Sequence, residues 1–174
     1  CADAIPATVD LPPRHAVVEL LGDENVLVHL VNLPMPASLQ AAHTPFTSHI
    51  VGRSKEMAIR LTDDKEMAKL NNDFRARDGS TNVLSFPNLD EADLNSLPKD
   101  APALLGDIVI ALDFTEREAK QQGKTLAAHL SHLVVHGTLH LLGYDHITKN
   151  DTMIMENLEI KVLAGLGISD PYAL

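Results

Sequence analysis

The chain has 174 residues with 24 acidic and 14 basic side chains, which gives a formal net charge of -10 at pH 7. This acidic balance argues against broad binding to phosphate backbones, and the absence of Trp, with two Tyr and four Phe, leaves no evident aromatic platform for stacking nucleic-acid bases. A single cysteine, Cys1, excludes an internal disulfide bond. We therefore expect residues 1–174 to form one domain that works in a reducing cytoplasm.

The N-terminal part, residues 1–56, is interrupted by six prolines and is poorly placed by its sequence pattern. Within it, Val26 to Leu33 is predicted to be a strand. The first residues show neither a basic cluster nor an apolar run, so we expect no signal peptide and interpret Cys1 as a trimmed start. No run is long enough to span a bilayer, so we expect no contact with membrane.

From residue 57 to 172 the pattern is clearer. Met57 to Leu61 is predicted to be a strand in which Arg60 faces away from Ile59 and Leu61. Thr62 or Asp63 can cap the helix that follows. The apolar side of that helix is predicted to be Met67, Leu70 and Phe74.

The second half alternates between strands and helices. Strands are expected at Thr81 to Phe86 and at Gly106 to Leu112, the latter interior to its sheet, with a loop from Asn88 to Pro102 between them. Asp113 is predicted to cap a helix to Gln122, and two further helices are expected at Leu126 to Leu142 and Asp151 to Leu163, the last burying Ile154, Met155, Leu158 and Val162. The whole predicts an α+β fold in which about four strands pack with several helices.

Three histidines suggest a metal centre. His136 and His140 are four residues apart on a predicted helix, so their rings lie on one face. Gly143 ends that helix, and His146 can then supply a third ligand from the returning chain. Three protein ligands leave a fourth position for water, which is the composition of a catalytic zinc site rather than a structural one. We expect one Zn²⁺ per chain at the C-terminal end of this helix.

Other polar residues near this motif have simpler interpretations. His129 and His132 are expected to pack or to support a ligand, because an isolated histidine on an apolar helix is usually a hydrogen-bonded core residue. Gly137 stands where zinc proteases of the HExxH type have a glutamate base, so that chemistry is disfavoured. Asp107, Asp145 and Ser85 are assigned no catalytic role; Asp145 either orients a histidine or belongs to the turn.

The stretch from His136 to His146, HGTLHLLGYDH, resembles the signature of the YbeY endoribonuclease family. Further segments agree in order, among them Arg60 to Asp64, Thr81 to Pro87, Leu105 to Ile108 and Asp170 to Tyr172. The chain departs from the family at Ala76, where Gly is common, and at Ser80, where Pro is common. Both changes would alter a turn more than the chemistry.

The resemblance implies a cytoplasmic, zinc-dependent endoribonuclease that cuts single-stranded RNA. Its expected partners are ribosomal RNA, notably the 3′ end of the small-subunit RNA, and the small subunit or its proteins; no DNA is expected. The family's three metal histidines map onto His136, His140 and His146, and its functional arginine is mapped onto Arg60.

Three arginines are candidates for contact with phosphate. Arg60 is predicted to be catalytic, because its planar guanidinium can hold a phosphate, although a salt bridge to Asp63 or Asp64 would explain it equally well from spacing. Arg75 and Arg77 are predicted to bind substrate, or else to be helix-terminal cations favoured by the helix dipole.

Two other functions remain open from the sequence. One is a zinc hydrolase of another substrate class, such as amides or esters. The other is a ribosome-associated RNA-binding factor in which zinc is structural and RNA is not cut.

Overall fold

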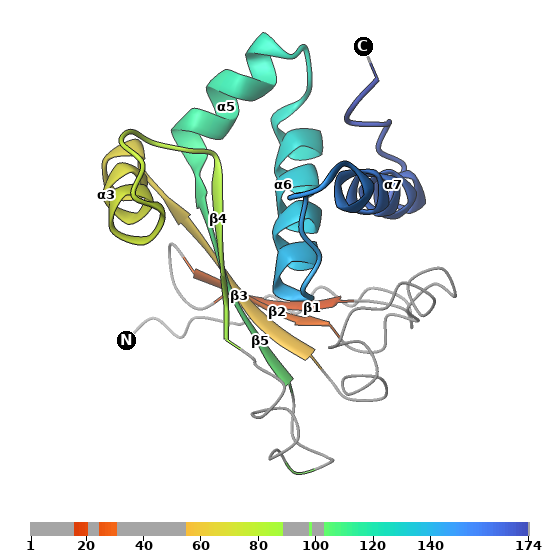
Figure 1. Cartoon of the computed structure of the whole chain (residues 1–174), viewed down its shortest axis with the longest axis horizontal. Helices are drawn as coiled ribbons and strands as arrows, with labels where there is room; N and C mark the ends of the chain where they lie inside the picture. The colour runs from red at the N-terminus through yellow and green to blue at the C-terminus, as the bar shows by residue number, and fades with distance from the viewer. Residues whose placement is uncertain (1–15, 21–24, 31–54, 89–97, 99–102, 174) are drawn as a thin grey trace, which may run out of the picture.

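A computed structural model of the chain describes residues 16–20, 25–30, 55–88, 98 and 103–173 (Figure 1). Its strands are β1 (Ala16–Leu20), β2 (Asn25–Leu30), β3 (Lys55–Thr62), β4 (Val83–Pro87) and β5 (Ala103–Ala111). Its helices are α3 (Asp64–Arg75), α5 (Leu112–Gln121), α6 (Leu126–Leu141) and α7 (Lys149–Gly165). Residues 31–33 of the first predicted strand, and most of the predicted loop from Asn88 to Pro102, lie outside the described residues.

The strands form one mixed sheet in the order β1-β2-β3-β5-β4. Strands β3 and β5 are parallel, and every other neighbouring pair is antiparallel. The fold is α+β as predicted, but among the described residues the sheet has five strands rather than about four. The additional strand is β1, which precedes β2 in the proline-rich region. Its five residues do not alternate between apolar and polar side chains, so no strand was predicted there. Strand β5 has a partner on both sides, as predicted for an interior strand.

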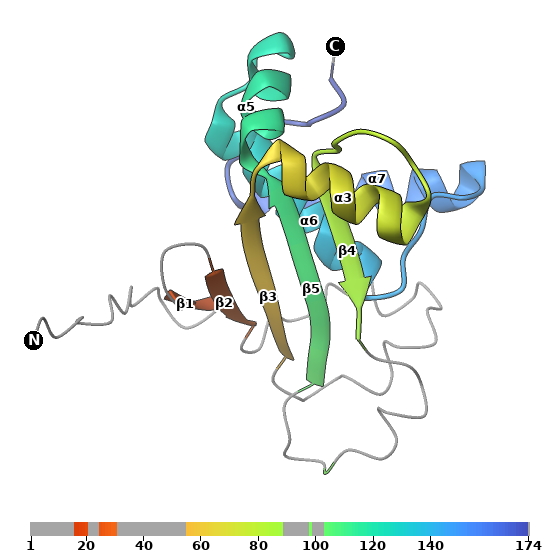
Figure 2. The same cartoon turned by 90° about the vertical axis from the view of Figure 1, so that its left-hand side faces the viewer.

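The two faces of the sheet are covered by different helices. Ile59, Ile108 and Leu133 belong to the hydrophobic cluster between the sheet and α6, whereas Met67 and Val109 belong to a cluster with α3 on the opposite face. Figure 2 shows α3 in front of the sheet and α6 behind it. Helix α7 packs against α6 through a third cluster made by Leu139, Tyr144, Met155 and Leu158. Helix α6 therefore lies between the sheet and α7.

Three local predictions were wrong. Asp113 does not cap α5: the helix follows β5 directly, its N-cap is Ala111, and Asp113 lies in the first turn, where its charge suits the helix dipole. Phe74 is 63% exposed, because in the last turn of α3 its ring meets Phe86 only edge-on. Ile154 is 38% exposed, because the face of α7 that packs on α6 is formed by Met155 and Leu158 instead.

The start of α3 follows the prediction. Asp63 is its N-cap, and the Asp63 carboxylate accepts the backbone N–H of Glu66 at 2.7 Å. Within the described part of the chain, no helix combines the length and the apolar character needed to cross a bilayer.

Candidate metal centre

The three predicted histidines lie together at the end of α6 and in the loop after it. Their ring nitrogens are within 4.8 Å of one another. His136 and His140 come from adjacent turns of α6, and their Nε2 atoms are 3.1 Å apart. The ring of His146 lies 5.5 Å from that of His136 and 5.0 Å from that of His140, between centroids. The sequence spacing thus brings three imidazoles to one point.

The loop after α6 holds His146 in place through its backbone. Gly143 has a φ of 87°, a left-handed conformation that glycine adopts without strain, and it lets the chain reverse. The backbone N–H of His146 donates to the Asp145 carboxylate at 2.8 Å. Its carbonyl accepts the hydroxyl of Thr152, in the first turns of α7, at 3.3 Å. Asp145 therefore belongs to the turn, in agreement with the simpler of its two interpretations.

Hydrogen bonds of the two helical histidines fix the position of their protons. Nδ1 of His136 lies 2.8 Å from Oε1 of Glu159, and Nδ1 of His140 lies 3.0 Å from the carbonyl oxygen of Tyr144. A carboxylate and a carbonyl only accept hydrogen bonds, so both Nδ1 atoms carry the proton. In the neutral rings, both Nε2 atoms then present lone pairs.

Two lone pairs facing each other at 3.1 Å repel unless a proton or a metal ion lies between them. Two nitrogens bound at roughly 2.0–2.1 Å to a tetrahedral zinc ion would be about 3.3 Å apart, close to the observed separation. Burial lowers the pKa of His140, and a proton on His136 or His146 would lower it further, which favours the neutral form that binds metal. The donor set therefore fits a zinc ion.

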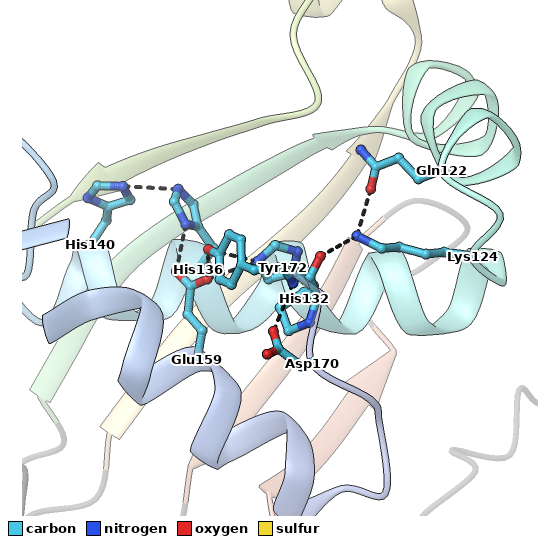
Figure 3. Close-up of polar contacts among 9 residues, drawn as sticks. Gln122, Lys124, His132, His136, His140, Glu159, Asp170 and Tyr172 are labelled. Carbon is cyan, nitrogen blue, oxygen red and sulfur yellow. Dashed lines mark hydrogen bonds and ion pairs between the residues drawn. The ribbon is translucent and has the colours of Figure 1, made fainter. Parts of the chain in front are cut away.

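A buried carboxylate supports the site from α7. Glu159 is 1% exposed, and its second oxygen accepts from Nε2 of His132 at 2.8 Å and from the hydroxyl of Tyr172 (Figure 3). Burial raises the pKa of Glu159, but hydrogen bonds from His132, His136 and Tyr172 outweigh it and lower the pKa to about 2. Glu159 is therefore ionised at neutral pH.

Gly137 lies between the helix and the sheet, away from the site. A Cβ atom built there would be 2.9 Å from Cδ1 of Ile108 and 3.0 Å from Oγ of Ser85. Any side chain at this position would collide with β4 and β5. The residue that follows the first histidine therefore has no room for a glutamate base, which gives a physical reason for the absence of the HExxH pattern.

A pocket of about 250 Å³ opens beside the histidines. It is lined by His136, His146, Thr152, Met155, Glu156, Glu159 and Tyr172. Two of the three clustered histidines, His136 and His146, thus border a space large enough for a fourth ligand or a substrate group.

Comparisons with known proteins identify the family of the chain. The family model described as "Endoribonuclease YbeY" matches residues 37–167. The chain belongs to the YbeY family.

Two YbeY relatives show how far the similarity extends. An "Endoribonuclease YbeY" of Sphingopyxis alaskensis is 55% identical over 120 residues, which cover 68% of this chain and 71% of the relative. One of Rhizorhabdus wittichii is 44% identical over 158 residues, or 90% of this chain and 88% of the relative. An alignment of that length reaches into the first 56 residues, for which the sequence alone showed no resemblance.

A solution structure from Thermotoga maritima is 27% identical, covers 67% of this chain and 77% of its own, and has a TM-score of 0.40.

Arg60 is not brought to the histidines. It lies on β3 with its neighbours Ile59 and Leu61 packed on the α6 side, so its own side chain points to the face covered by α3. There it forms an ion pair with Glu66 at 2.5 Å and stays 41% exposed. An acidic partner was foreseen, but it is Glu66 rather than Asp63 or Asp64.

Arg75 and Arg77 are both exposed, at the end of α3 and in the turn beyond it. Between them, Ala76 adopts the left-handed conformation with a φ of 51° and caps the helix. Glycine would adopt this conformation freely, whereas alanine takes it up at a cost in strain, so the departure expected at Ala76 falls on a helix cap.

Sequence reasoning missed Glu159 and Tyr172. A signal for Glu159 was present: together with Met155, Leu158 and Val162 it follows the spacing of a helix's apolar face, so a charge was placed where a hydrophobic residue is expected. Tyr172 was noted only within the family-like segment Asp170 to Tyr172, and its role was missed because its contact is with another element, Glu159 of α7. His132 does support the site, through Glu159, and His129 packs and pairs with Glu118 at 2.7 Å.

Asp107 is exposed, and Ser85 is buried beneath Gly137.

Proposed function

We propose that this chain is a zinc-dependent endoribonuclease that hydrolyses phosphodiester bonds in single-stranded RNA. One observation carries the proposal: the Nε2 atoms of His136 and His140 face each other, with His146 as a third histidine in the same cluster, in a chain whose relatives are named endoribonucleases. The proposed role is ribosomal RNA maturation, at the 3′ end of the small-subunit RNA, and ribosome quality control in the cytoplasm. The small subunit or its proteins are the proposed partners, because an acidic chain gains little unaided affinity for RNA.

The proposed chemistry needs three tasks from the protein. His136, His140 and His146 would hold one zinc ion per chain, which when bound supplies a Lewis acid for a phosphate oxygen and lowers the pKa of water. Glu159 and the carbonyl of Tyr144 keep the two helical rings in the tautomer that presents Nε2. The pocket beside His136 and His146 admits the scissile phosphate.

A surface at the end of α3 is the proposed contact with the rest of the RNA. Arg75 and Arg77 are exposed there, and the ring of Phe74, 63% exposed, lies beside them in sequence. Exposed cations bind phosphates and an exposed ring stacks on bases, which is the combination used for single strands. Replacing Arg75 by Ala should weaken RNA binding and make it less dependent on salt, by about 0.7 in the log–log slope for each phosphate that the variant no longer neutralises.

The catalytic role of Arg60 stays a prediction, and its position favours an indirect one. Arg60→Ala should leave zinc content unchanged. A lowered cleavage rate with zinc intact would support a role in catalysis. Cleavage at the wild-type rate, or loss of the fold, would reduce Arg60 to the partner of Glu66.

The deciding experiment measures bound metal by elemental analysis and cleavage of single-stranded RNA in the same samples, for the wild type and for His136→Ala. We expect about one zinc per chain in the wild type, lost together with cleavage in the variant. A wild type without metal, or a variant that still cuts RNA, would contradict the proposal. Turnover of esters or peptides without RNA cleavage would indicate another hydrolase, and RNA bound intact with zinc needed only for folding would indicate a structural site.

A further inference from the structure

Glu159 occupies a position where its carboxylate meets a metal ligand at full burial. It comes from α7, is 1% exposed, and its Oε1 lies 2.8 Å from Nδ1 of His136. That nitrogen is on the opposite side of the ring from the Nε2 that faces His140. A group that holds Nδ1 therefore sets both the proton and the direction of the lone pair on Nε2.

The second oxygen of Glu159 is held by two other side chains. His132, one turn before His136 on α6, places Nε2 at 2.8 Å, and the hydroxyl of Tyr172 donates to the same oxygen. The rings of His132 and Tyr172 meet edge-on with centroids 5.4 Å apart. Each of the two carboxylate oxygens thus has a defined partner, and the carboxylate has little freedom to rotate.

Tyr172 itself is fixed, although it belongs to the segment after α7. Its backbone N–H donates to the Asp170 carboxylate at 2.8 Å. The carbonyl of Pro171 accepts from Nζ of Lys124, just before α6, at 2.6 Å. Figure 3 shows this chain of contacts running from Lys124 to His140 along one side of α6.

We propose that Glu159 is a positioning residue for the metal ligand His136, and that Tyr172 holds Glu159 in place, so that the C-terminal segment sets the strength of metal binding. The inference rests on the proposed metal centre. Partners that orient a ligating histidine change metal affinity by about 10- to 100-fold when they are removed.

The molecule contains a matched control for this pair. On the same helix, Nε2 of His129 lies 2.7 Å from Oε2 of Glu118, and His129 is 3% exposed. This is also a hydrogen bond between a buried histidine of α6 and a glutamate of a neighbouring helix. His129 is not among the three clustered histidines, so Glu118→Gln tests the removal of such a bond without touching the metal centre.

The experiment measures zinc dissociation constants by competition with a chromophoric chelator, using full-length wild type, Glu159→Gln, Glu159→Asp, Tyr172→Phe and Glu118→Gln. Thermal unfolding of each metal-free protein reports folding separately. The ¹⁵N chemical shifts of His136 report which ring nitrogen carries the proton. Neither zinc affinity nor the tautomer depends on RNA cleavage.

We expect Glu159→Gln to weaken zinc binding about 10- to 100-fold and to mix the tautomers of His136. Glu159→Asp keeps the charge but draws the carboxylate back by one methylene, so it should also bind zinc more weakly. Tyr172→Phe should weaken binding about two- to fivefold, and should add nothing to Glu159→Gln, because Tyr172 acts through Glu159. Glu118→Gln should bind zinc within about twofold of the wild type.

Wild-type zinc affinity in whichever Glu159 variant folds would overturn the inference, and so would an equal loss of affinity in Glu118→Gln. Should neither Glu159 variant fold, Tyr172→Phe decides, since Tyr172 is 41% exposed and its ring is retained. Failure of the proposed function looks different: the wild type would bind no zinc, or His136→Ala would bind it equally well.

Discussion

Helix α6 carries three histidine–glutamate hydrogen bonds, and two of them, toward its opposite ends, differ in the surroundings of the other ring nitrogen. Near its N-terminal end, His129 meets Glu118 of α5 at 2.7 Å; nearer its C-terminal end, His136 meets Glu159 of α7 at 2.8 Å. The other ring nitrogen of His129 is buried and has no hydrogen-bond partner in the described part of the chain. The other nitrogen of His136 faces Nε2 of His140 at 3.1 Å, and His136 is one of the residues that line a pocket.

This difference distinguishes the pair of His129, which serves packing, from that of His136, which belongs to the candidate metal centre. In both pairs the glutamate links α6 to a neighbouring helix. Burial raises the pKa of Glu118, but its hydrogen bonds to Asn82 and His129 outweigh this effect and lower the pKa. Of these two pairs, only that of His136 has its second nitrogen close to ring nitrogens of other histidines. A histidine–carboxylate pair is therefore no evidence of a metal site until the free nitrogen is located.

The largest expected effect concerns folding at the His129 end. His129→Ala should destabilise the metal-free protein by about 2–4 kcal/mol, because it leaves a cavity and deprives the half-buried Glu118 of a hydrogen bond. Denaturant unfolding measures the change. Zinc content should stay at the wild-type level, and a loss of zinc would show that the two ends of α6 are not independent.

The next effect belongs to the His136 end. Zinc at a free concentration 100 times its dissociation constant should stabilise the wild type by about 2.7 kcal/mol, and a chelator should remove this gain. His136→Ala should show no stabilisation by zinc, whereas His129→Ala should keep it. Thermal unfolding of both variants with and without zinc measures this stabilisation. An equal response of the two variants to zinc would contradict the assignment of the metal site to the His136 end.

Between the two ends, Gly137 sets how closely α6 approaches the sheet. Gly137→Ala should cost about 1–3 kcal/mol, because the new methyl group would meet Ile108 and Ser85. Gly165→Ala in α7 is the control: no atom lies within 4 Å of its Cβ position, so alanine should be neutral or stabilising there. Equal effects of both substitutions would indicate that helix propensity, and not the steric contact, decides.

The smallest effect tests how the loop holds the third ligand. Thr152→Val removes the hydroxyl that donates to the carbonyls of Thr148 at 3.0 Å and His146 at 3.3 Å, and it should weaken zinc binding at most about tenfold. Thr115→Val in α5 removes a comparable hydroxyl, bonded to the carbonyl of Ala111, far from the loop in sequence. Its zinc affinity should match that of the wild type. Unchanged affinity in Thr152→Val would mean that the turn holds His146 without α7.

Much of this arrangement could be predicted from the sequence wherever the cause is local. The spacing of His136 and His140 and the break at Gly143 predicted the cluster, because one helical turn and its end fix where those rings point. The role of Glu159 required knowing that α7 packs on α6, which no local pattern states. For Arg60, strand alternation predicted that its side chain points away from that of Ile59. Which of the two faces α6 covers is decided by tertiary packing, so the sequence could not predict whether Arg60 would lie near the histidines.

The order in which the site is completed follows from its layout along the chain. The three histidines fall within one short stretch from His136 to His146, whereas Glu159 comes 23 residues after His136 and Tyr172 later still. During synthesis the ribosome therefore exposes all three nitrogen ligands before the carboxylate that orients the first of them. If Glu159 and Tyr172 set zinc affinity as proposed, a nascent chain can meet zinc early but holds it at full strength only once these two residues have emerged.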